Sequence, residues 1–175
     1  MTGLLTPGEP HAAHGPRRSQ ADARLLSELV LFVRVHRQPG RPGLLWPEHT
    51  GPDGRHHPPG ELADALALRL GLPVAALPAP ARPAAEPAAA PYDLLVLQQE
   101  GSSGWQLRPP GRPAAVTAEC GAGQELRLRA GEVLYVPAGY ATRSRPARES
   151  RDIRLALGPH VLPDGRYRRP GTANT

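Results

Sequence analysis

Short apolar runs separated by Gly and Pro fill the second half of this chain, and they limit its possible folds more than any other feature. The runs lie at 93–98, 105–108, 114–118, 124–129, 133–136 and 153–157. Residues 124–129 and 153–157 alternate polar and apolar side chains, which is the period-2 pattern of a strand with one buried face. Strands that recur at intervals of about 8–12 residues indicate an all-β sandwich or barrel. We therefore expect a mainly β core over 92–160.

The first half of the chain has a different composition. Pro and Gly account for 23 and 19 of the 175 residues, and 15 of the Pro lie before residue 92. This composition is typical of chain without a packed core of its own. The expected segments are a disordered tail over 1–18, a helical flank with a Gly/Pro loop over 19–77 and an Ala/Pro linker over 78–91. A second flexible tail is expected over 161–175.

Two helices are predicted within the flank. Leu and Val side chains recur at three- and four-residue spacing over 20–36, which predicts an amphipathic helix, although the β-branched stretch 31–35 would also suit a strand. Leu62, Leu66 and Leu70 follow the same spacing and predict a second helix over 61–70. Gly71 fits the left-handed residue that commonly follows a helix end.

The composition excludes several classes of protein. The single cysteine, Cys120, rules out intramolecular disulfides and Cys-rich zinc modules. No apolar run is long enough to span a bilayer, and the first residues lack the pattern of a signal peptide, so we expect no membrane contact and a cytoplasmic location. All 21 basic residues are arginine and the net charge is +5. GC-rich codon usage accounts for the missing lysines more simply than a nucleic-acid partner does.

Three blocks of sequence resemble a known family. Residues 131–142, GEVLYVPAGYAT, resemble the second cupin motif G-x5-P-x-G-x2-H, with Gly131, Pro137 and Gly139 in place. Asp93–Gln98 with Gly101 and Trp105 resembles the D-V-F-V-L-Q-x-x-G-x-x-x-W stretch of the cupin-like Jumonji family, which includes bacterial ribosomal-protein hydroxylases. Residues 153–158 resemble the strand that closes the core of this family. The resemblance covers 92–158 and implies a cupin-like double-stranded β-helix with an N-terminal helical flank.

The resemblance also implies where an iron site would lie. Members of this family are Fe(II)- and 2-oxoglutarate-dependent oxygenases that hold iron with an H-x-D pair and a distal His. Carried onto this chain, the pair falls on Ala88 and Ala90, and the distal His falls on Thr142. Alanine cannot ligate a metal, and the Thr hydroxyl is a poor neutral ligand. The basic residues that this family often places between the Gly and the Trp are replaced by Ser102-Ser103-Gly104.

The leading functional hypothesis is therefore a catalytically degenerate relative of these oxygenases that binds a protein partner or a second copy of itself. No cofactor is expected. Because 92–160 is short for eight strands, the barrel is either incomplete or completed by dimerisation. An active Fe(II)/2-oxoglutarate-dependent hydroxylase is the alternative, and its ligands would come from a loop that holds His49, His56 and His57 with Glu48 and Asp53. A solvated polar loop is the simpler interpretation of these residues.

A second alternative is an Arg-rich nucleic-acid- or ribosome-associated binding protein. Its phosphate contacts would come from the arginines near the C-terminus: Arg143, Arg145, Arg148, Arg151, Arg154, Arg166, Arg168 and Arg169. These could equally form a solvated face that Glu149 and Asp152 partly neutralise. Trp105 and Tyr135 fall in predicted strands and suit a core better than a ligand platform. Cys120 has no neighbouring His in the sequence and suits an ordinary turn thiol.

Overall fold

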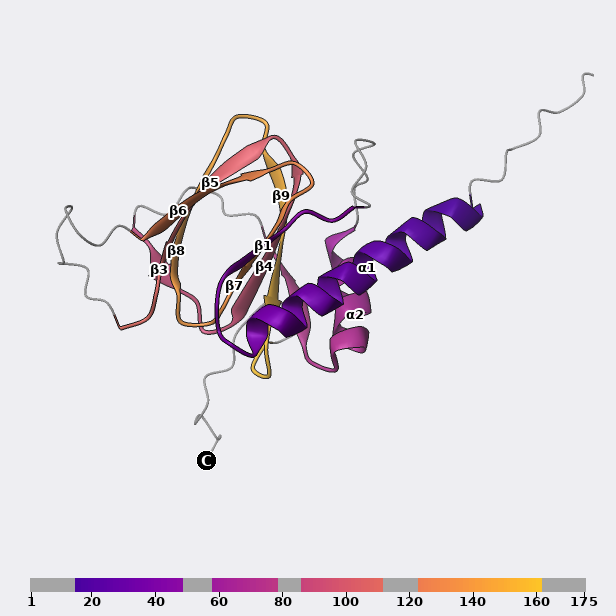
Figure 1. The fold of residues 1–175 in the computed structure, drawn as a ribbon, viewed down its shortest axis with the longest axis horizontal. Helices are drawn as coiled ribbons and strands as arrows, with labels where there is room; N and C mark the ends of the chain where they lie inside the picture. The colour runs from indigo at the N-terminus through magenta and orange to yellow at the C-terminus, as the bar shows by residue number, and fades with distance from the viewer. Residues whose placement is uncertain (1–14, 49–57, 79–85, 112–122, 162–175) are drawn as a thin grey trace, which may run out of the picture.

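The computed structural model describes residues 15–48, 58–78, 86–111 and 123–161. These residues form two helices and nine strands arranged as two antiparallel sheets (Figure 1). The helices are α1 (Gly15–Arg37) and α2 (Pro59–Leu70). The strands are β1 (Gly43–Leu45), β2 (Val74–Leu77), β3 (Ala88–Ala89), β4 (Asp93–Glu100), β5 (Ser102–Arg108), β6 (Gln124–Arg129), β7 (Val133–Val136), β8 (Ala141–Pro146) and β9 (Arg151–Leu157).

The connections between the sheets confirm the expected mainly β, cupin-like fold. One sheet has five strands in the order β1-β7-β4-β9-β2, and the other has four in the order β3-β8-β5-β6. From β2 to β9 the chain passes to the other sheet at every step except in the β5–β6 hairpin. This closed two-sheet arrangement of eight strands belongs to the jelly-roll and cupin class. β1 is an additional strand at the edge of the larger sheet.

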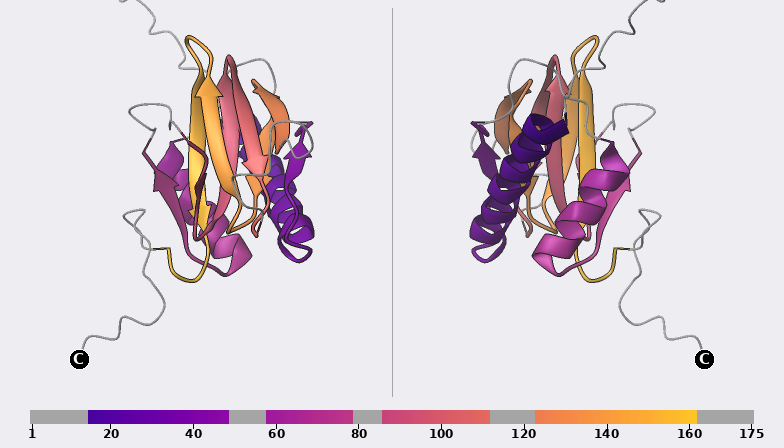
Figure 2. Two further views of the ribbon diagram at one scale, coloured as in Figure 1. Left: turned by 90° about the vertical axis from the view of Figure 1, so that its left-hand side faces the viewer. Right: turned by 90° about the vertical axis from the view of Figure 1, so that its right-hand side faces the viewer.

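The two helices cover the outer face of the five-stranded sheet (Figure 2). α1 places Leu25, Leu29 and Val33 on one side at helical spacing, and all three are buried. α2 begins with Pro59 in its first turn and ends at Gly71, whose φ of 68° is left-handed. Both helices pack on the strand residues that point outward from the barrel, among them Leu95 of β4.

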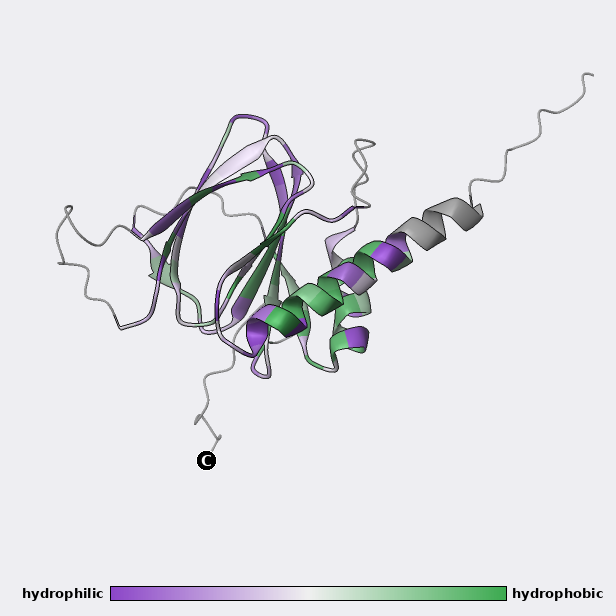
Figure 3. Ribbon diagram, in the orientation of Figure 1, coloured by the Kyte–Doolittle hydropathy of each residue, from purple (hydrophilic) through white to green (hydrophobic). Residues whose placement is uncertain are grey.

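A second apolar cluster lies between the two sheets. Alternate residues of β4 divide between the clusters, because successive side chains of a strand point to opposite faces. Leu95 and Leu97 face the helices, whereas Leu94 and Val96 face the barrel interior. The interior cluster is completed by Trp105, Leu107, Leu128, Leu134 and Val136. The central strands β4 and β7 are accordingly hydrophobic on both faces, whereas β6 alternates (Figure 3).

Most predicted elements are confirmed. The helices predicted over 20–36 and 61–70 correspond to α1 and α2. The predicted strands 93–98, 105–108, 124–129, 133–136 and 153–157 correspond to β4, β5, β6, β7 and β9. The strand predicted over 114–118 lies outside the described residues. No described helix is both long and apolar enough to cross a bilayer.

The N-terminal segments differ from expectation, because they contribute strands to the sheets. The flank 19–77 supplies β1 and β2, and the Ala/Pro linker 78–91 supplies β3. α1 begins at Gly15, inside the expected tail 1–18. The β core is therefore not confined to 92–160, and the eight strands of the barrel are all present within one chain. β1, β2 and β3 are only two to four residues long, which is too short for a period to be recognised in the sequence. They are defined by their pairing with β7, β9 and β8, respectively.

Candidate functional site

The β3–β8 pair brings together two of the three positions at which the resemblance places iron ligands. Ala88 lies directly opposite Thr142, and Ala89 lies opposite Ala141. Directly paired residues of an antiparallel ladder share one face of the sheet. Thr142 is also opposite Leu107, which is buried between the sheets. Ala88 and Thr142 therefore lie on the inner face of the four-stranded sheet, where Ala88 is exposed and Thr142 is half-buried.

The side chains at these positions do not fit an iron centre. A facial triad requires two imidazoles and one carboxylate, whereas Ala88 and Ala90 carry methyl groups without lone pairs. The described residues contain no group of three His, Cys, Asp or Glu side chains that could hold a metal ion. Asp53 and the loop histidines His49, His56 and His57 lie outside the described residues, so the loop site stays a prediction, as do the inferences about Cys120 and Arg166–Arg169.

The residues of the cupin-like motif stabilise the turn that leads into β8. Asp93 accepts a hydrogen bond from the backbone N–H of Ala138 at 2.9 Å and pairs with Arg37 Nε at 3.1 Å. The N–H of Gly139 donates to the carbonyl of Ala90 at 2.8 Å. Gly139 has a φ of 85°, a conformation in which a Cβ would be strained. Asp93 and Gly139, two positions on which the resemblance rests, thus hold the turn between β7 and β8 in place.

A buried polar network occupies the other end of the barrel. Gln98 is 1% exposed, and its Oε1 accepts a hydrogen bond of 2.6 Å from Ser103 Oγ. Its Nε2 donates to Ser150 Oγ at 2.8 Å and to the carbonyl of Glu100 at 2.7 Å. Trp105 Nε1 donates to Ser103 Oγ at 2.8 Å. The serines that replace the basic cluster of the resembled family therefore have a structural role here, joining β4, β5 and the β8–β9 turn.

Arg154 lies inside the barrel, which corrects its grouping with the surface arginines. Its side chain is 13% exposed, and its Nη2 lies 2.8 Å from Asp152 Oδ2 and 3.2 Å from Ser144 Oγ. The guanidinium also lies over the Trp105 ring, 5.1 Å from the centroid. Asp152 balances this buried charge, and the ring face adds a favourable cation–π contact. The alternation of β9 could have predicted this position. Ile153 and Leu155 face the helices, so Arg154 between them must point to the opposite face, into the barrel.

A cleft of about 230 Å³ lies beside the start of β4 and the end of β9, and Arg37, Tyr92, Asp93 and His160 are among its lining residues, whereas none of the three iron-ligand positions lines it. Burial raises the pKa of Tyr92, and the nearby charge of Arg154 opposes this rise. In the core beneath the helices, burial and then the negative charge of Asp93 raise the pKa of Tyr135 well above its usual value. Both tyrosines therefore keep their protons at neutral pH. Trp105 and Tyr135 are both buried core residues.

The outer face of the four-stranded sheet carries a cluster of arginines that the linear sequence does not reveal. The inner side chains of β5 are Ser103, Trp105 and Leu107, so its other residues and their cross-strand partners point outward. The outward arginines, which we call the arginine face, are Arg108 of β5, Arg127 and Arg129 of β6, and Arg143 and Arg145 of β8. Only the last two were among the arginines that the sequence had suggested for phosphate contact.

Comparison with known proteins gives similarity to solved structures over part of the chain. No family model and no curated protein matches. The ribosomal oxygenase YcfD from Escherichia coli is similar, with a TM-score of 0.39 and 19% identity over 64% of this chain and 29% of that chain. A hydroquinone 1,2-dioxygenase, PnpCD, has a TM-score of 0.35 and 20% identity over 51% and 59% of the two chains. The sugar 3,4-ketoisomerase QdtA from Thermoanaerobacterium thermosaccharolyticum has a TM-score of 0.33 and 9% identity over 56% and 60%. This chain thus spans less than two thirds of the length of each of these proteins.

Proposed function

We propose that this chain is a cupin-like binding domain without an iron centre, related to the Jumonji-type oxygenases but acting through a partner rather than through oxidation. The pairing of Ala88 with Thr142 on the inner face of β3 and β8 is the observation that carries the proposal. It indicates that the aligned positions are spatial neighbours, as the ligands of one metal would have to be. At these positions the chain offers methyl groups and a hydroxyl.

The polar groups of the barrel interior also support a binding function rather than oxygenase activity. A 2-oxoglutarate-dependent enzyme needs a positive charge that is available to a carboxylate of its cosubstrate. Arg154 points into the barrel, but Asp152 already neutralises it at 2.8 Å. Ser103, which stands in the place of the basic cluster, is buried and bonds to Gln98, whereas Ser102 lies on the outer face and accepts from Arg127. The interior is therefore built for packing and internal hydrogen bonding.

Metal loading and turnover test this proposal directly. The full chain would be incubated with excess Fe(II) under anaerobic conditions, desalted and measured by elemental analysis, and then assayed for conversion of 2-oxoglutarate to succinate. We expect far less than one iron per chain and succinate formation no faster than in buffer with iron. Stoichiometric iron together with turnover would overturn the proposal and favour the alternative of an active hydroxylase.

A restoration experiment tests the positional argument itself. The triple variant Ala88→His, Ala90→Asp, Thr142→His should gain binding of one Co²⁺ ion, detected by its visible absorption bands. The matched control Ala88→His, Ala90→Asp, Arg143→His introduces the same three side chains but places the last one on the outer face of β8. We expect no such binding in the control. If the triple variant is folded but binds Co²⁺ no better than the control, the three positions do not converge on one site, and the argument for the proposal fails.

A further inference from the structure

The arginine face brings five arginines that have no carboxylate partner among the described residues onto one surface of the molecule. Three arginines elsewhere in the chain are paired with carboxylates: Arg37 with Asp93, Arg151 with Glu100 and Arg154 with Asp152. No arginine of the arginine face forms an ion pair with a carboxylate of the described residues. Among the outward positions of β5, β6 and β8 the one acidic residue is Glu125. The face therefore presents a strong excess of positive charge.

A shallow hollow lies at the centre of this face. It has a volume of about 100 Å³, and its lining residues are Gly104, Trp105, Gln106, Glu125, Leu126, Arg143 and Arg145. Gly104 lies between Arg145 and Arg127 on its two neighbouring strands and has no side chain to fill the space between them. The buried Nε–H of Arg143 has no acceptor among the described residues. A donor with an unmet hydrogen bond thus borders a hollow of positive potential.

The spacing of the arginines suits a repeating anion. Arg143 and Arg145 are two residues apart on one strand, or about 7 Å, and Arg145 and Arg127 are two strands apart, or about 10 Å. A single small anion could not reach all of them at once. The backbone of a nucleic acid presents phosphates along its whole length, and guanidinium groups bind phosphate oxygens with two parallel hydrogen bonds.

We propose that the arginine face binds the phosphate backbone of a duplex nucleic acid without reading its sequence. This inference rests on the proposed binding function, since it names the partner. The outward positions of the three strands are Ser, Gly, Gln, Glu, Ala and Arg, with no large apolar or aromatic side chain. A protein partner would need an apolar centre to its interface, and a single strand would need aromatic rings on which bases could stack. Contacts with a duplex backbone need neither.

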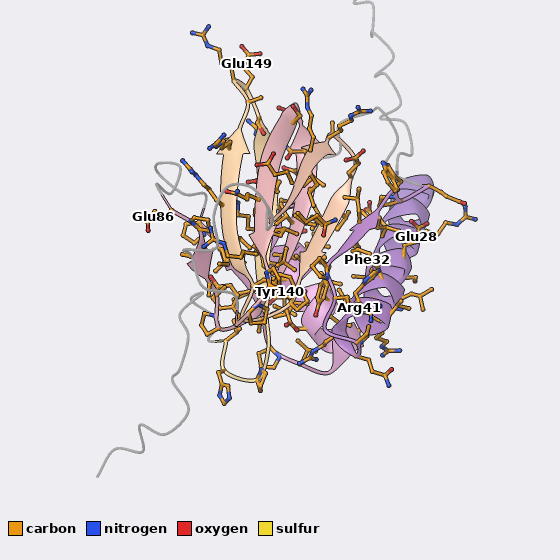
Figure 4. All side chains as sticks on the ribbon, turned by 60° about the vertical axis from the view of Figure 1, so that its left-hand side comes forward. Glu28, Phe32, Arg41, Glu86, Tyr140 and Glu149 are labelled. Carbon is orange, nitrogen blue, oxygen red and sulfur yellow. The ribbon has the colours of Figure 1, made fainter. Side chains whose placement is uncertain are left out.

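The proposal is tested by fluorescence anisotropy with a labelled 20-base-pair RNA duplex. The measurement is repeated with a DNA duplex of the same sequence and with a duplex of unrelated sequence. Affinity should fall with salt, and the slope of log K against log salt should be about −0.9 for each neutralised phosphate. The double variant Arg143→Gln, Arg145→Gln should make this slope shallower by about two. The control Arg41→Gln, Arg69→Gln removes the same charge from exposed positions near the helices, where Figure 4 shows Arg41, and should leave the slope unchanged.

A second pair of variants changes the hollow without removing any arginine. A Cβ at Gly104 would meet the carbonyl oxygen of Arg145 at an ordinary 3.8 Å, so a side chain can be accommodated. Gly104→Glu places a negative charge at the centre of the face and should abolish duplex binding at 100 mM salt. Gly104→Gln adds a side chain of the same size without charge and should retain most of it. Circular dichroism melts of both variants confirm that each is folded.

Three results would overturn the proposal: no binding of either duplex at 50 mM salt, equal loss in the two double variants, or tighter binding of poly-glutamate than of duplex. The last result would assign the face to an acidic protein instead. The arginine face and the iron-ligand positions lie on opposite faces of the same sheet, so the two proposals fail separately. Absence of duplex binding in an iron-free chain would overturn only this inference. Stoichiometric iron and turnover in a chain that still binds duplex would overturn only the metal-free function.

Discussion

The outer faces of the two sheets differ sharply although the sheets share one interior. The outer face of the five-stranded sheet is apolar, with Leu95, Leu155 and Leu157 fully buried beneath α1 and α2. The outer face of the four-stranded sheet has no helix of the described residues over it and carries the arginine face (Figure 2). Both faces are built by the same period-2 alternation, and only the residue types at the outward positions differ.

This difference assigns the two faces different roles: the helix-covered face stabilises the fold, and the arginine face is available for binding. Burial of apolar side chains beneath the helices contributes free energy of folding, roughly 1.5–3 kcal/mol for each large side chain. Exposed arginines contribute little to folding but attract anions over a distance comparable to the Debye length. The helix-covered face should therefore respond to mutation through stability, and the arginine face through affinity. The following predictions test this division from the largest expected effect to the smallest.

The largest effect is expected beneath the helices. Leu95→Ala removes a fully buried side chain between β4 and the helices and should lower the free energy of unfolding by about 2–5 kcal/mol. Urea denaturation followed by circular dichroism measures this loss. Leu68→Ala on α2 is the control, because Leu68 is 84% exposed and its truncation should change the free energy by less than about 0.5 kcal/mol. Equal losses in the two variants would contradict the packing of the helices on this sheet.

The shared interior should also be sensitive. Asp152→Ala leaves the Arg154 guanidinium without its carboxylate inside the barrel. Breaking a fully buried pair costs roughly 3–5 kcal/mol. Because both side chains keep slight exposure, we expect a loss of about 2–3 kcal/mol, measured by urea denaturation.

The matched control for the buried pair is Glu100→Ala, which removes the carboxylate from the exposed pair with Arg151, where the charged atoms are 4.0 Å apart. Exposed pairs contribute about 0–1 kcal/mol. A loss for Asp152→Ala no larger than that for Glu100→Ala would show that Arg154 is solvated rather than held inside the barrel.

Tyr135 gives a smaller effect that appears only at alkaline pH. Burial raises the pKa of Tyr135 in the folded chain, whereas in the unfolded chain its pKa is near the ordinary tyrosine value of 10.0. Above pH 10 the unfolded state therefore binds fewer protons than the folded state, and stability falls as pH rises, by up to about 1.4 kcal/mol per pH unit. Tyr135→Phe should make this fall shallower between pH 10 and 11.5. An unchanged slope in denaturation experiments would contradict the burial of the hydroxyl.

The smallest effect on stability is expected on the arginine face. Arg143→Gln, Arg145→Gln should change the free energy of unfolding by less than about 0.5 kcal/mol, because neither side chain forms an ion pair with a described carboxylate. Thermal melts measure this alongside the binding experiments. A loss of several kcal/mol would show that these arginines hold the four-stranded sheet together, and the division between the two faces would fail.

The sequence predicted the elements whose patterns are local. Gln124–Arg129 alternates polar and apolar side chains, and its predicted bounds agree with β6. The turn residues Gly131 and Gly139 also have the left-handed φ that only glycine adopts without strain. The strands β1, β2 and β3 were missed because two to four residues are too few to show a period. β8 was missed because Thr142 to Arg145 has no apolar residue on either face.

The candidate site likewise depends on contacts between residues that are distant in the sequence. The resemblance assigned Ala88 and Thr142 to one site, but they are 54 positions apart along the chain, and only the register of β3 with β8 makes them neighbours. The arginines were grouped by their order in the chain. The structure instead divides them by strand and by face, so that Arg154 turns inward to Asp152 while Arg143 and Arg145 join Arg127.

The sequence by itself determined which residues could form strands and helices, and it determined the loss of imidazole and carboxylate groups from the aligned iron positions. Both are properties of short segments, because alternation, turn chemistry and side-chain type need no distant partner. The tertiary structure decided which strands are neighbours, and with them the arginine face and the pairing of Arg154. Strand order follows from burying both sheets against one interior and one sheet against the helices, a requirement of the whole chain that no single segment records.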